Sequence, residues 1–528
     1  MEQDNATRDP LIDMEGITKR FPGVLANDSV DFSVEKGEIH ALVGENGAGK
    51  TTLMKILYGL YGMDDGQIYF RDEPVEIEDP KAANQLGIGM VHQHFMLVPP
   101  LSVVDNITLG REIANYGVLD REEAKERIRE LASDIGFDID PEATVEDLSV
   151  GVRQRIEILK VLFREAEVLI LDEPTAVLTP QEVESLYEIL NNLQEGGKTI
   201  IFITHKLNEV MDIADRVTVM RDGKYVGTKK IENTSKNELA NMMVGREVLL
   251  RVEKEETERG EELLRAENLT IRGEEGNKVV DDVSFTVSEG EVFGIAGVQG
   301  NGQSKLIEAL TGIEEFSSGS VEIQESDLTK ADGQELREAG VGHIPEDRLQ
   351  RGLITEFTVT ENFVLGYHPF ERYSSRVFMK LKEMDSHAKQ AVEKFDIKTP
   401  STRTLVESLS GGNQQKLIVA RELSQQPNLL IAAQPTRGID VGAIEFVHKR
   451  LMEERAKGKG LLLVSSELDE IMSLSDRIAV IYEGEFTALF DSDETTKEEL
   501  GVYMTGSQRQ DKEEVRRKAL DEVSEGMM

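Results

Sequence analysis

The amino-acid sequence predicts an α/β protein of two consecutive domains, each a mainly parallel sheet flanked by helices. The chain has 528 residues, more than one hydrophobic core usually supports. Short apolar runs, such as residues 168–171 and 199–203, alternate with longer segments of helical period, which is typical of parallel strands joined by helices. The second half of the sequence also repeats the first, which indicates two domains of the same fold.

The repeat is visible at two places that lie far apart in the chain. Residues 37–44 (GEIHALVG) recur as residues 290–297 (GEVFGIAG), 253 positions later. Residues 148–149 (LS) recur as residues 409–410, 261 positions later. An insertion of eight residues in the second copy accounts for the difference, so we interpret the chain as a duplication with one change of length.

The repeat divides the chain into four segments. The first domain spans residues 1–248 and the second spans residues 263–507. Residues 249–262 between them are charged and lack an apolar face, so we expect a short exposed linker. The last segment, residues 508–528, is also highly charged and is expected to form a helical or frayed tail.

Composition and charge exclude several classes of function. The net charge of −40 repels nucleic-acid phosphates, so no nucleic-acid partner is expected. The absence of cysteine excludes disulfides, thiolate zinc sites and cysteine nucleophiles. No apolar run approaches the roughly 20 residues of a membrane-spanning helix, and the N-terminus is acidic where a signal peptide is basic, so we expect a cytoplasmic protein. The acidic composition indicates adaptation to a salt-rich, haloarchaeal-type cytoplasm; the alternative is a generously solvated acidic protein.

A glycine-rich motif follows the apolar run 39–43. Residues 44–51 (GENGAGKT) match the pattern GxxxxGK[ST], and a helical run comes directly after them. Glycines let backbone N–H groups surround phosphates, Lys50 reaches the β and γ oxygens, and Thr51 supplies a ligand for Mg²⁺. We therefore expect ATP and Mg²⁺ to bind at Gly44, Glu45, Asn46, Gly47, Ala48, Gly49, Lys50, Thr51 and Thr52.

Two carboxylates follow the apolar strand predicted at residues 168–171. Ligands of parallel sheets bind at the carboxyl ends of the strands, so Asp172 and Glu173 are expected beside the phosphate loop. Asp172 can hold Mg²⁺ through water, and Glu173 is the natural general base for the attacking water. His205 follows the strand predicted at 199–203 and is expected to contact the γ-phosphate. In the alternative interpretation these three residues are purely structural.

Further motifs carry a resemblance to a known family. Gln93 ends the segment MVHQ, and residues 409–415 read LSGGNQQ. Together with the phosphate loop and the strand-end carboxylates, this order of motifs resembles the ABC-transporter ATPase family over nearly the whole chain. Residues 173–180 (EPTAVLTP) and 243–247 (MVGRE) are similar to the tandem ATPases of simple-sugar and nucleoside importers. The resemblance implies two ABC-type nucleotide-binding domains, each with a helical subdomain and an antiparallel β portion.

The resemblance also implies roles for single residues. Gln93 is expected to take part in catalysis and to contact the metal. Phe21 lies where the family places an aromatic residue that stacks on adenine, with an ordinary core phenylalanine as the alternative. The duplicated position falls near Glu274 in a charged, glycine-rich loop, so adenine stacking is expected to be missing from the second half.

Family members pair two domains head to tail, so each ATP lies between the phosphate loop of one domain and the LSGGQ-like signature of the other. The sequence does not decide whether the two domains of one chain pair or whether pairing occurs between chains. The residues implied to complete the first-domain site are Ser410, Gly411, Gly412, Gln414 and Asp440.

The second domain lacks the catalytic residue types of the first. At the positions of Lys50, Gln93, Asp172, Glu173 and His205 it carries Gln303, Glu346, Ala433, Gln434 and Ser466. Without a carboxylate base, hydrolysis there should be slow or absent.

The first domain, in turn, has the weaker signature. Residues 148–154 read LSVGVRQ, and Thr179 lies where the second domain has Asp440. Head-to-tail pairing therefore gathers all intact parts at one site and all altered parts at the other. The residues of the degenerate site are Gly297, Gly302, Gln303, Ser304, Ala433, Gln434, Ser466, Ser149 and Gly151.

These features predict the energy-coupling ATPase subunit of an importer for a monosaccharide such as glucose or ribose, with a nucleoside as the alternative solute. The resemblance implies two membrane permeases and, indirectly, an extracellular solute-binding lipoprotein as partners. The chain would then lie at the cytoplasmic face of the membrane as a peripheral protein. A tandem ATPase acting on ribosomes or DNA and an ATP-sensing scaffold without turnover are the rival hypotheses.

Overall fold

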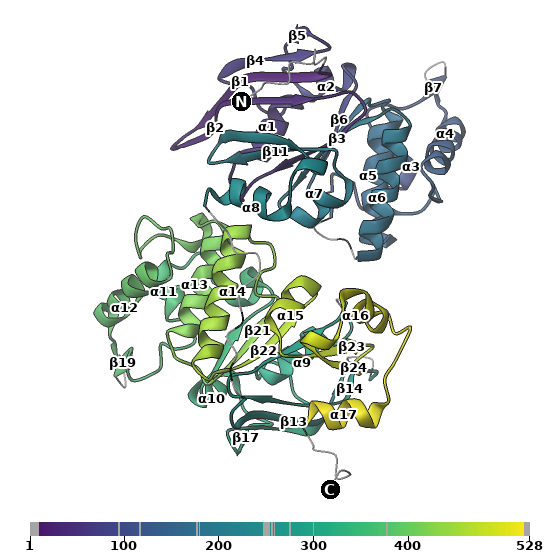
Figure 1. Ribbon diagram of the computed structural model, residues 1–528. Coiled ribbons are helices and arrows are strands. Elements are labelled where there is room, and N and C mark those ends of the chain that lie inside the picture. The colour runs from purple at the N-terminus through teal and green to yellow at the C-terminus, as the bar shows by residue number, and fades with distance from the viewer. Residues whose placement is uncertain are drawn as a thin grey trace. The chain divides into compact units, whose positions relative to one another are not determined.

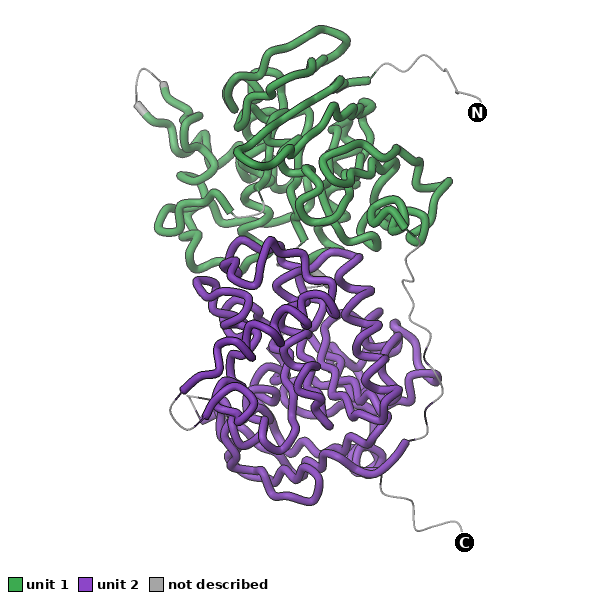
Figure 2. Tube along the Cα trace, turned by 90° about the vertical axis from the view of Figure 1, so that its left-hand side faces the viewer, with its two compact units in different colours: residues 1–248 green, residues 249–528 purple. Residues whose placement is uncertain are grey.

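The chain folds into two compact units, residues 1–248 and residues 249–528 (Figure 2). The computed structural model describes residues 10–92, 95–115, 118–175, 178, 180–246, 254, 257, 259–273, 276–298, 300–375 and 378–521.

Two sheets form the framework of unit 1 (Figure 1). Its strands are β1 (Ile12–Phe21), β2 (Val24–Val34), β3 (Ile39–Val43), β4 (Asp65–Phe70), β5 (Glu73–Val75), β6 (Ile88–Val91), β7 (Ala114–Asn115), β8 (Val118–Leu119), β9 (Val168–Asp172), β10 (Thr199–Thr204), β11 (Arg216–Arg221) and β12 (Lys224–Lys230). An antiparallel sheet has the order β2-β1-β4-β5. The larger sheet has the order β12-β11-β3-β10-β9-β6 and is parallel except for β12.

The register of the parallel strands determines where the functional residues meet. Every residue of β3, β9 and β10 is buried, as expected for apolar strands covered on both faces. Thr204 lies opposite Val43, and Ile203 lies opposite Asp172. The segments that follow these three strands therefore leave the sheet at the same edge.

Helices cover the larger sheet of unit 1 and build a separate helical part. Its helices are α1 (Lys50–Leu57), α2 (Pro80–Gln85), α3 (Val103–Thr108), α4 (Arg121–Asp134), α5 (Val150–Phe163), α6 (Pro180–Glu195), α7 (Leu207–Ile213) and α8 (Lys236–Val244). In the helical part α3, α4 and α5 pack on one another through buried residues such as Ile107, Ile128 and Ile158. A β7–β8 hairpin precedes α4.

Unit 2 repeats this arrangement of strands. They are β13 (Glu262–Arg272), β14 (Lys278–Ser288), β15 (Val292–Ala296), β16 (Ser318–Ile323), β17 (Ser326–Asp327), β18 (Val341–Ile344), β19 (Ser374–Ser375), β20 (Phe378–Met379), β21 (Leu429–Ala433), β22 (Gly460–Ser465), β23 (Arg477–Tyr482) and β24 (Glu485–Asp491). The antiparallel sheet has the order β14-β13-β16-β17, and the larger one has the order β18-β21-β22-β15-β23-β24. The predicted pair of α/β domains with antiparallel β portions is confirmed.

The helices of unit 2 also match those of unit 1, and one helix is added at the end. They are α9 (Gln303–Leu310), α10 (Gly333–Glu338), α11 (Val359–Phe363), α12 (Leu381–Lys394), α13 (Gly411–Leu423), α14 (Val441–Ala456), α15 (Leu468–Leu474), α16 (Lys497–Met504) and α17 (Lys512–Ala519). The helical part consists of α11, α12 and α13, with a β19–β20 hairpin before α12. Among the described residues, no helix is both long and apolar enough to cross a bilayer.

The described part of the charged linker and the C-terminal helix both contact unit 2. Lys254 donates from Nζ to the Ser475 carbonyl oxygen and to Ser492 Oγ, the latter over 3.2 Å. Helix α17 packs on β14 and β24 and buries Val515 and Ala519. The charged tail thus contains a helix with an apolar face, and its last residues, 522–528, lie outside the described part of the chain.

Candidate functional site

The predicted phosphate loop connects β3 to α1. Gly49 is the N-cap of α1 and has a φ of 94°, a left-handed conformation that favours glycine. A Cβ atom at Gly49 would lie only 2.3 Å from the carbonyl oxygen of Ala26. Asn27 adds a hydrogen bond from Nδ2 to the Gly49 carbonyl oxygen over 3.2 Å. The sequence motif therefore corresponds to a tight strand–loop–helix turn, and Asn27 is a supporting residue that the motif itself does not reveal.

Lys50 lies on the inner side of this loop. Its side chain is buried, and Nζ donates to the carbonyl oxygens of Gly44 and Glu45 over 2.7 and 3.0 Å. These contacts hold the ammonium group inside the ring of loop backbone that would surround the phosphates. A lysine in this position can stabilise the charge of the β- and γ-phosphates.

Thr51 and Asp172 form an oxygen pair next to the loop. Thr51 Oγ1 donates to Asp172 Oδ1 over 3.3 Å. Burial raises the pKa of Asp172, and the nearby charge of Glu173 raises it further. A hydroxyl and a carboxylate are hard oxygen donors, and Mg²⁺ bound to phosphates typically needs only one or two protein ligands. The pair therefore fits Mg²⁺.

Glu173 and His205 lie in contact at the sheet edge, a pairing that the sequence motifs do not specify. Glu173 Oε1 lies 2.9 Å from His205 Nδ1. Glu173 has a left-handed φ of 48°, and its N–H donates to the carbonyl oxygen of Ile203 over 2.9 Å. Burial alone would raise the pKa of Glu173, but the hydrogen bond and charge of His205, together with Lys50, outweigh burial and lower it. Glu173 is thus held as a carboxylate that can accept a proton.

Glu209 supports the two strand ends, and its role was not predicted from the sequence. Its buried carboxylate accepts hydrogen bonds from the hydroxyls of Thr175 and Thr204, the second over 2.8 Å. Thr204 directly precedes His205, and Thr175 follows Glu173 by two positions. Glu209 lies on α7, and no motif marks it, because only the packing of α7 brings it to these residues.

Phe21, the predicted adenine-stacking residue, lies at the end of β1 and is 37% exposed. Its ring contacts Tyr61 edge-on, with centroids 5.5 Å apart, and Lys19 Nζ lies 5.6 Å from the ring centre. This exposure differs from that of a core phenylalanine. Gln93, Thr179 and Glu274 lie outside the described residues.

The second unit reproduces the contacts of the first with neutral side chains. Gln303 Nε2 donates to the carbonyl oxygen of Val298 over 3.1 Å, at the position of the Lys50–Glu45 contact. Ser466 Oγ donates to Gln434 Oε1 over 3.2 Å, at the position of the His205–Glu173 contact. Gln434 also has a left-handed φ, of 45°.

The metal position of the second unit is changed as well. Ala433 is buried where the first unit has Asp172, and it offers no oxygen ligand from its side chain. Ser304 Oγ instead donates to Glu346 Oε2 over 2.7 Å. The shape of the site is thus kept, but neither strand-end carboxylate is present.

The signature residues of unit 2 lie together at the start of α13. Ser410 is the N-cap of α13, and Asn413 Nδ2 donates to Ser410 Oγ over 2.8 Å. A Cβ atom at Gly412 would lie 3.0 Å from Asp440 Oδ2, so the signature and Asp440 are adjacent. Gln414 is buried and donates from Nε2 to the Val406 carbonyl oxygen over 3.1 Å.

The weaker signature of unit 1 differs in its surroundings. Ser149 is the N-cap of α5 and accepts a hydrogen bond from the N–H of Val152 over 3.4 Å. A Cβ atom at Gly151 would meet the carboxylate of Glu182 at 2.1 Å. A glutamate therefore lies against this signature, whereas an aspartate that caps the next helix lies against the other.

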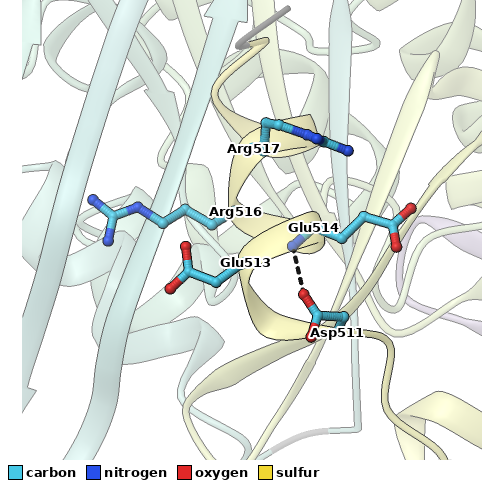
Figure 3. A pocket seen from close by; sticks show the side chains of 5 residues that line it. All are labelled: Asp511, Glu513, Glu514, Arg516 and Arg517. Atoms are coloured by element: carbon cyan, nitrogen blue, oxygen red, sulfur yellow. Dashed lines mark hydrogen bonds between the residues drawn. The ribbon is translucent and has the colours of Figure 1, made fainter. Parts of the chain in front are cut away.

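A surface depression of about 410 Å³ lies elsewhere, at the beginning of α17 (Figure 3). Asp511 caps this helix by accepting from the N–H of Glu514 over 3.1 Å. The lining side chains come from one short segment, with Glu513 and Arg516 on one side of the helix and Glu514 and Arg517 on the other (Figure 3). The residues that line the depression are Asp511, Glu513, Glu514, Arg516 and Arg517. None of them is a predicted site residue.

The phosphate loop, the oxygen pair and the Glu173–His205 pair define a nucleoside-triphosphate-hydrolysing domain of the phosphate-loop class. Comparison with protein families identifies the particular family. The ABC transporter family matches residues 27–176 and 280–437, and the chain belongs to this family. It is therefore an ATP-binding ATPase with two ABC domains in tandem.

Individual relatives match nearly the whole chain. A guanosine import ATP-binding protein of Bacillus subtilis is 50% identical over 94% of this chain and 98% of its own length. A glucose import ATP-binding protein of Haloferax volcanii is 46% identical over 95% of this chain and 96% of its own length. A chain in the crystal structure of an archaeal ribosomal stalk protein with an archaeal ribosome recycling factor is 19% identical, with a TM-score of 0.61, over 89% of this chain and 88% of that chain, and this likeness shows the fold alone.

Proposed function

We propose that this chain is the ATP-hydrolysing, energy-coupling subunit of an importer for a monosaccharide, such as glucose or ribose, or for a nucleoside. The full-length similarity to import ATP-binding proteins for guanosine and for glucose supports this proposal. The observation that carries it is the set of hydrolytic groups among the described residues of unit 1, namely Lys50, Thr51, Asp172, Glu173 and His205.

Hydrolysis at the first unit follows from its geometry. Glu173 is ionised, so it can orient the attacking water and accept its proton. His205 contacts that carboxylate and would, in this proposal, also contact the γ-phosphate. When bound at Thr51 and Asp172, Mg²⁺ would neutralise charge on the phosphates.

We further propose that the signature of the second domain completes this site. Ser410, Gly412 and Asp440 are adjacent in unit 2, as a phosphate-contacting surface requires. The pattern of substitution supports the pairing, because the domain with the intact catalytic residues has the weaker signature and the other domain has the reverse. One hydrolytic site and one degenerate site per pair of domains result.

The proposed partners follow from the same function. Two permease subunits in the membrane would carry the solute, and an extracellular solute-binding lipoprotein would deliver it. The ATPase would bind the permeases at the cytoplasmic face as a peripheral subunit. ATP binding would close paired domains and hydrolysis would reopen them, which drives the permeases between states.

ATP turnover by the assembled transporter tests the assignment of the sites. Glu173→Gln should reduce turnover by about 100-fold or more, because general-base catalysis contributes that much. Gln434→Ala should leave turnover near the wild-type value. Equal losses in both variants would show that the second site turns over or gates the first, and the proposal of a single hydrolytic site would then be wrong.

Uptake measurements separate the two classes of solute. Vesicles containing the transporter would be loaded with ATP, and entry of labelled glucose, ribose and guanosine would be compared in wild type and Glu173→Gln. Uptake that depends on Glu173 identifies the solute. If ATP turnover occurs but none of these solutes enters, the solute assignment fails while the ATPase assignment stands.

A further inference from the structure

The β19–β20 hairpin of unit 2 exposes a patch of large apolar side chains. Phe378 is 75% exposed, Met379 is 49% exposed and Leu381 is 67% exposed. Figure 1 shows β19 at the outer edge of unit 2, beside α12 and away from the sheets of the unit. Single exposed apolar residues are ordinary in proteins, but three within four positions form a patch that indicates a binding surface.

Basic residues outnumber acidic ones around this patch although the chain as a whole is acidic. Residues 371–383 contain four basic residues and two acidic ones, Glu371 and Glu383 at the borders, in a chain with 100 acidic and 60 basic residues. Arg372 donates to the Gln425 side-chain oxygen over 3.1 Å, and Lys380 donates to a backbone carbonyl oxygen over 2.7 Å. Within the described part of the chain, neither of them nor Lys382 forms an ion pair with a carboxylate. Their charges are therefore available to an outside anion.

The first domain contains the matched element without this chemistry. Its β7–β8 hairpin leads into α4 as β19–β20 leads into α12, and both helices have 14 residues. The N-cap of α4 is Asp120, whose carboxylate accepts a hydrogen bond from the N–H of Glu123 over 3.1 Å. The N-cap of α12 is Lys380, which makes no capping hydrogen bond with its side chain.

The change at Lys380 works against the stability of α12. A cation at this end of a helix faces the positive end of the helix dipole, and a lysine cannot cap the free N–H groups. Local choices that oppose the fold are typical of functional surfaces. The hairpin of unit 2 thus lacks the side-chain helix cap that its counterpart in unit 1 has, and it carries an exposed apolar patch next to two lysines.

We propose that the β19–β20 hairpin, with Lys380 and Lys382, binds the anionic lipid surface of a membrane. Phe378, Met379 and Leu381 would enter the headgroup region, and the lysines would contact lipid phosphates. Apolar side chains beside lysines are the combination that binds membrane interfaces. The Debye length is about 8 Å at 0.15 M salt. Lysines in contact with the lipid phosphates therefore attract them, whereas the repulsion from carboxylates farther away on the protein is largely screened. This inference goes beyond the proposed function, because binding would require neither a permease nor ATP.

Sedimentation of the full chain with vesicles tests the proposal. Vesicles of phosphatidylglycerol and phosphatidylcholine in equal parts are compared with pure phosphatidylcholine, in the lowest salt at which the chain keeps its native circular dichroism. We expect the chain to bind the anionic vesicles only, and a variant with Phe378→Ser, Met379→Ser and Leu381→Ser to lose this binding. At low ionic strength, Lys382→Gln should weaken partitioning about fivefold, since a basic residue at a lipid surface contributes about that factor.

Matched variants separate binding from misfolding. Leu119→Ser changes a residue of the β8 strand in unit 1 that is 61% exposed, and it should leave vesicle binding unchanged. Lys380→Asp restores the cap that Asp120 provides in α4, so it should raise thermal stability while it weakens vesicle binding.

Three outcomes would overturn the proposal. They are absent binding of the wild type, equal binding to both kinds of vesicle, and unchanged binding of the triple serine variant. If the triple variant instead fails to co-purify with the permeases while its vesicle behaviour equals that of the wild type, the patch docks on protein and the lipid assignment is wrong. ATP turnover of the chain is read in parallel, so a failure of this proposal is distinguishable from a failure of the proposed function.

Discussion

Glu173 and His205 show how far residues alone can locate a site. Each follows a buried apolar strand, and neighbouring parallel strands end at the same edge, so both could be assigned to that edge, whereas their mutual contact is a finding of the structure. Glu209 could not be found in this way. It reaches Thr175 and Thr204 only because α7 packs at the strand ends, and this packing depends on side chains distant in the sequence.

The pKa of Glu173 predicts the response of hydrolysis to acid. Burial raises this pKa, but the hydrogen bond and charge of His205 outweigh burial and hold it below the ordinary value of 4.5, so the base itself stays ionised as pH falls to that value. His205→Ala removes the contact and leaves burial as the largest influence, so the pKa should rise and the acid limb of the rate profile should move to higher pH. The pH dependence of single-turnover ATP hydrolysis measures this shift, and an unmoved acid limb in the variant would refute it.

At the scale of elements, the β3–α1 turn was predicted and the two helix–hairpin junctions were not. The motif at residues 44–51 requires glycine for different reasons at different positions: Gly47 and Gly49 have a positive φ, whereas Gly44 and Gly49 have no room for a Cβ atom. The starts of α4 and α12 occupy equivalent places in the duplicated fold, yet one has an aspartate cap and the other a lysine. Helical periodicity predicts both helices, but it gives no information on whether the N-cap side chain makes a hydrogen bond to the first turn.

Gly49→Ala tests the turn against a matched glycine. Gly458, just after α14, has a similar φ of 82° but open space around it, so Gly458→Ala should cost only about 1–2 kcal/mol of left-handed strain. Gly49→Ala adds a clash with the Ala26 carbonyl oxygen, so its unfolding free energy should fall further and ATP binding should be lost. Chemical denaturation and nucleotide titration measure both effects. Equal destabilisation by the two substitutions would contradict the role assigned to the clash.

At the scale of the whole molecule, each unit contains a buried ion pair between a glutamate and an arginine. The arginine lies on the strand next to the one that leads into the phosphate loop or its counterpart. In unit 2, Arg477 Nε contacts Glu291, which is fully buried, over 2.7 Å, and Arg259 of the linker contacts the same carboxylate over 2.6 Å. In unit 1, Arg216 contacts Glu38 over 3.2 Å. The duplication could be predicted from the sequence. The packing of the linker and of α17 against the rest of unit 2 could not, because both segments are highly charged and their few buried side chains form no recognisable apolar pattern.

The two arginines predict separate effects on the two units. Arg477→Leu leaves Glu291 with Arg259 and the Ser288 N–H, and Arg216→Leu leaves Glu38 with His40 and the Glu35 N–H. Each should therefore cost about 1.5–3 kcal/mol in its own unit, the net contribution of a hydrogen bond to a charged group. Differential scanning calorimetry should show each variant lowering a different transition. If both variants lower the same transition by the same amount, the units do not unfold independently.

The hydrogen bond between Ser466 and Gln434 bears on how the duplicated gene has changed. Both side chains differ from the first copy, yet their contact survives, as does the left-handed backbone at Gln434. The second unit thus keeps the local geometry of the first with side chains that carry no charge at positions 303, 433, 434 and 466. If the proposal of a single hydrolytic site holds, giving the second unit activity would need carboxylates at 433 and 434, a histidine at 466 and a lysine at 303 together. No single one of these substitutions should then create a second hydrolytic centre.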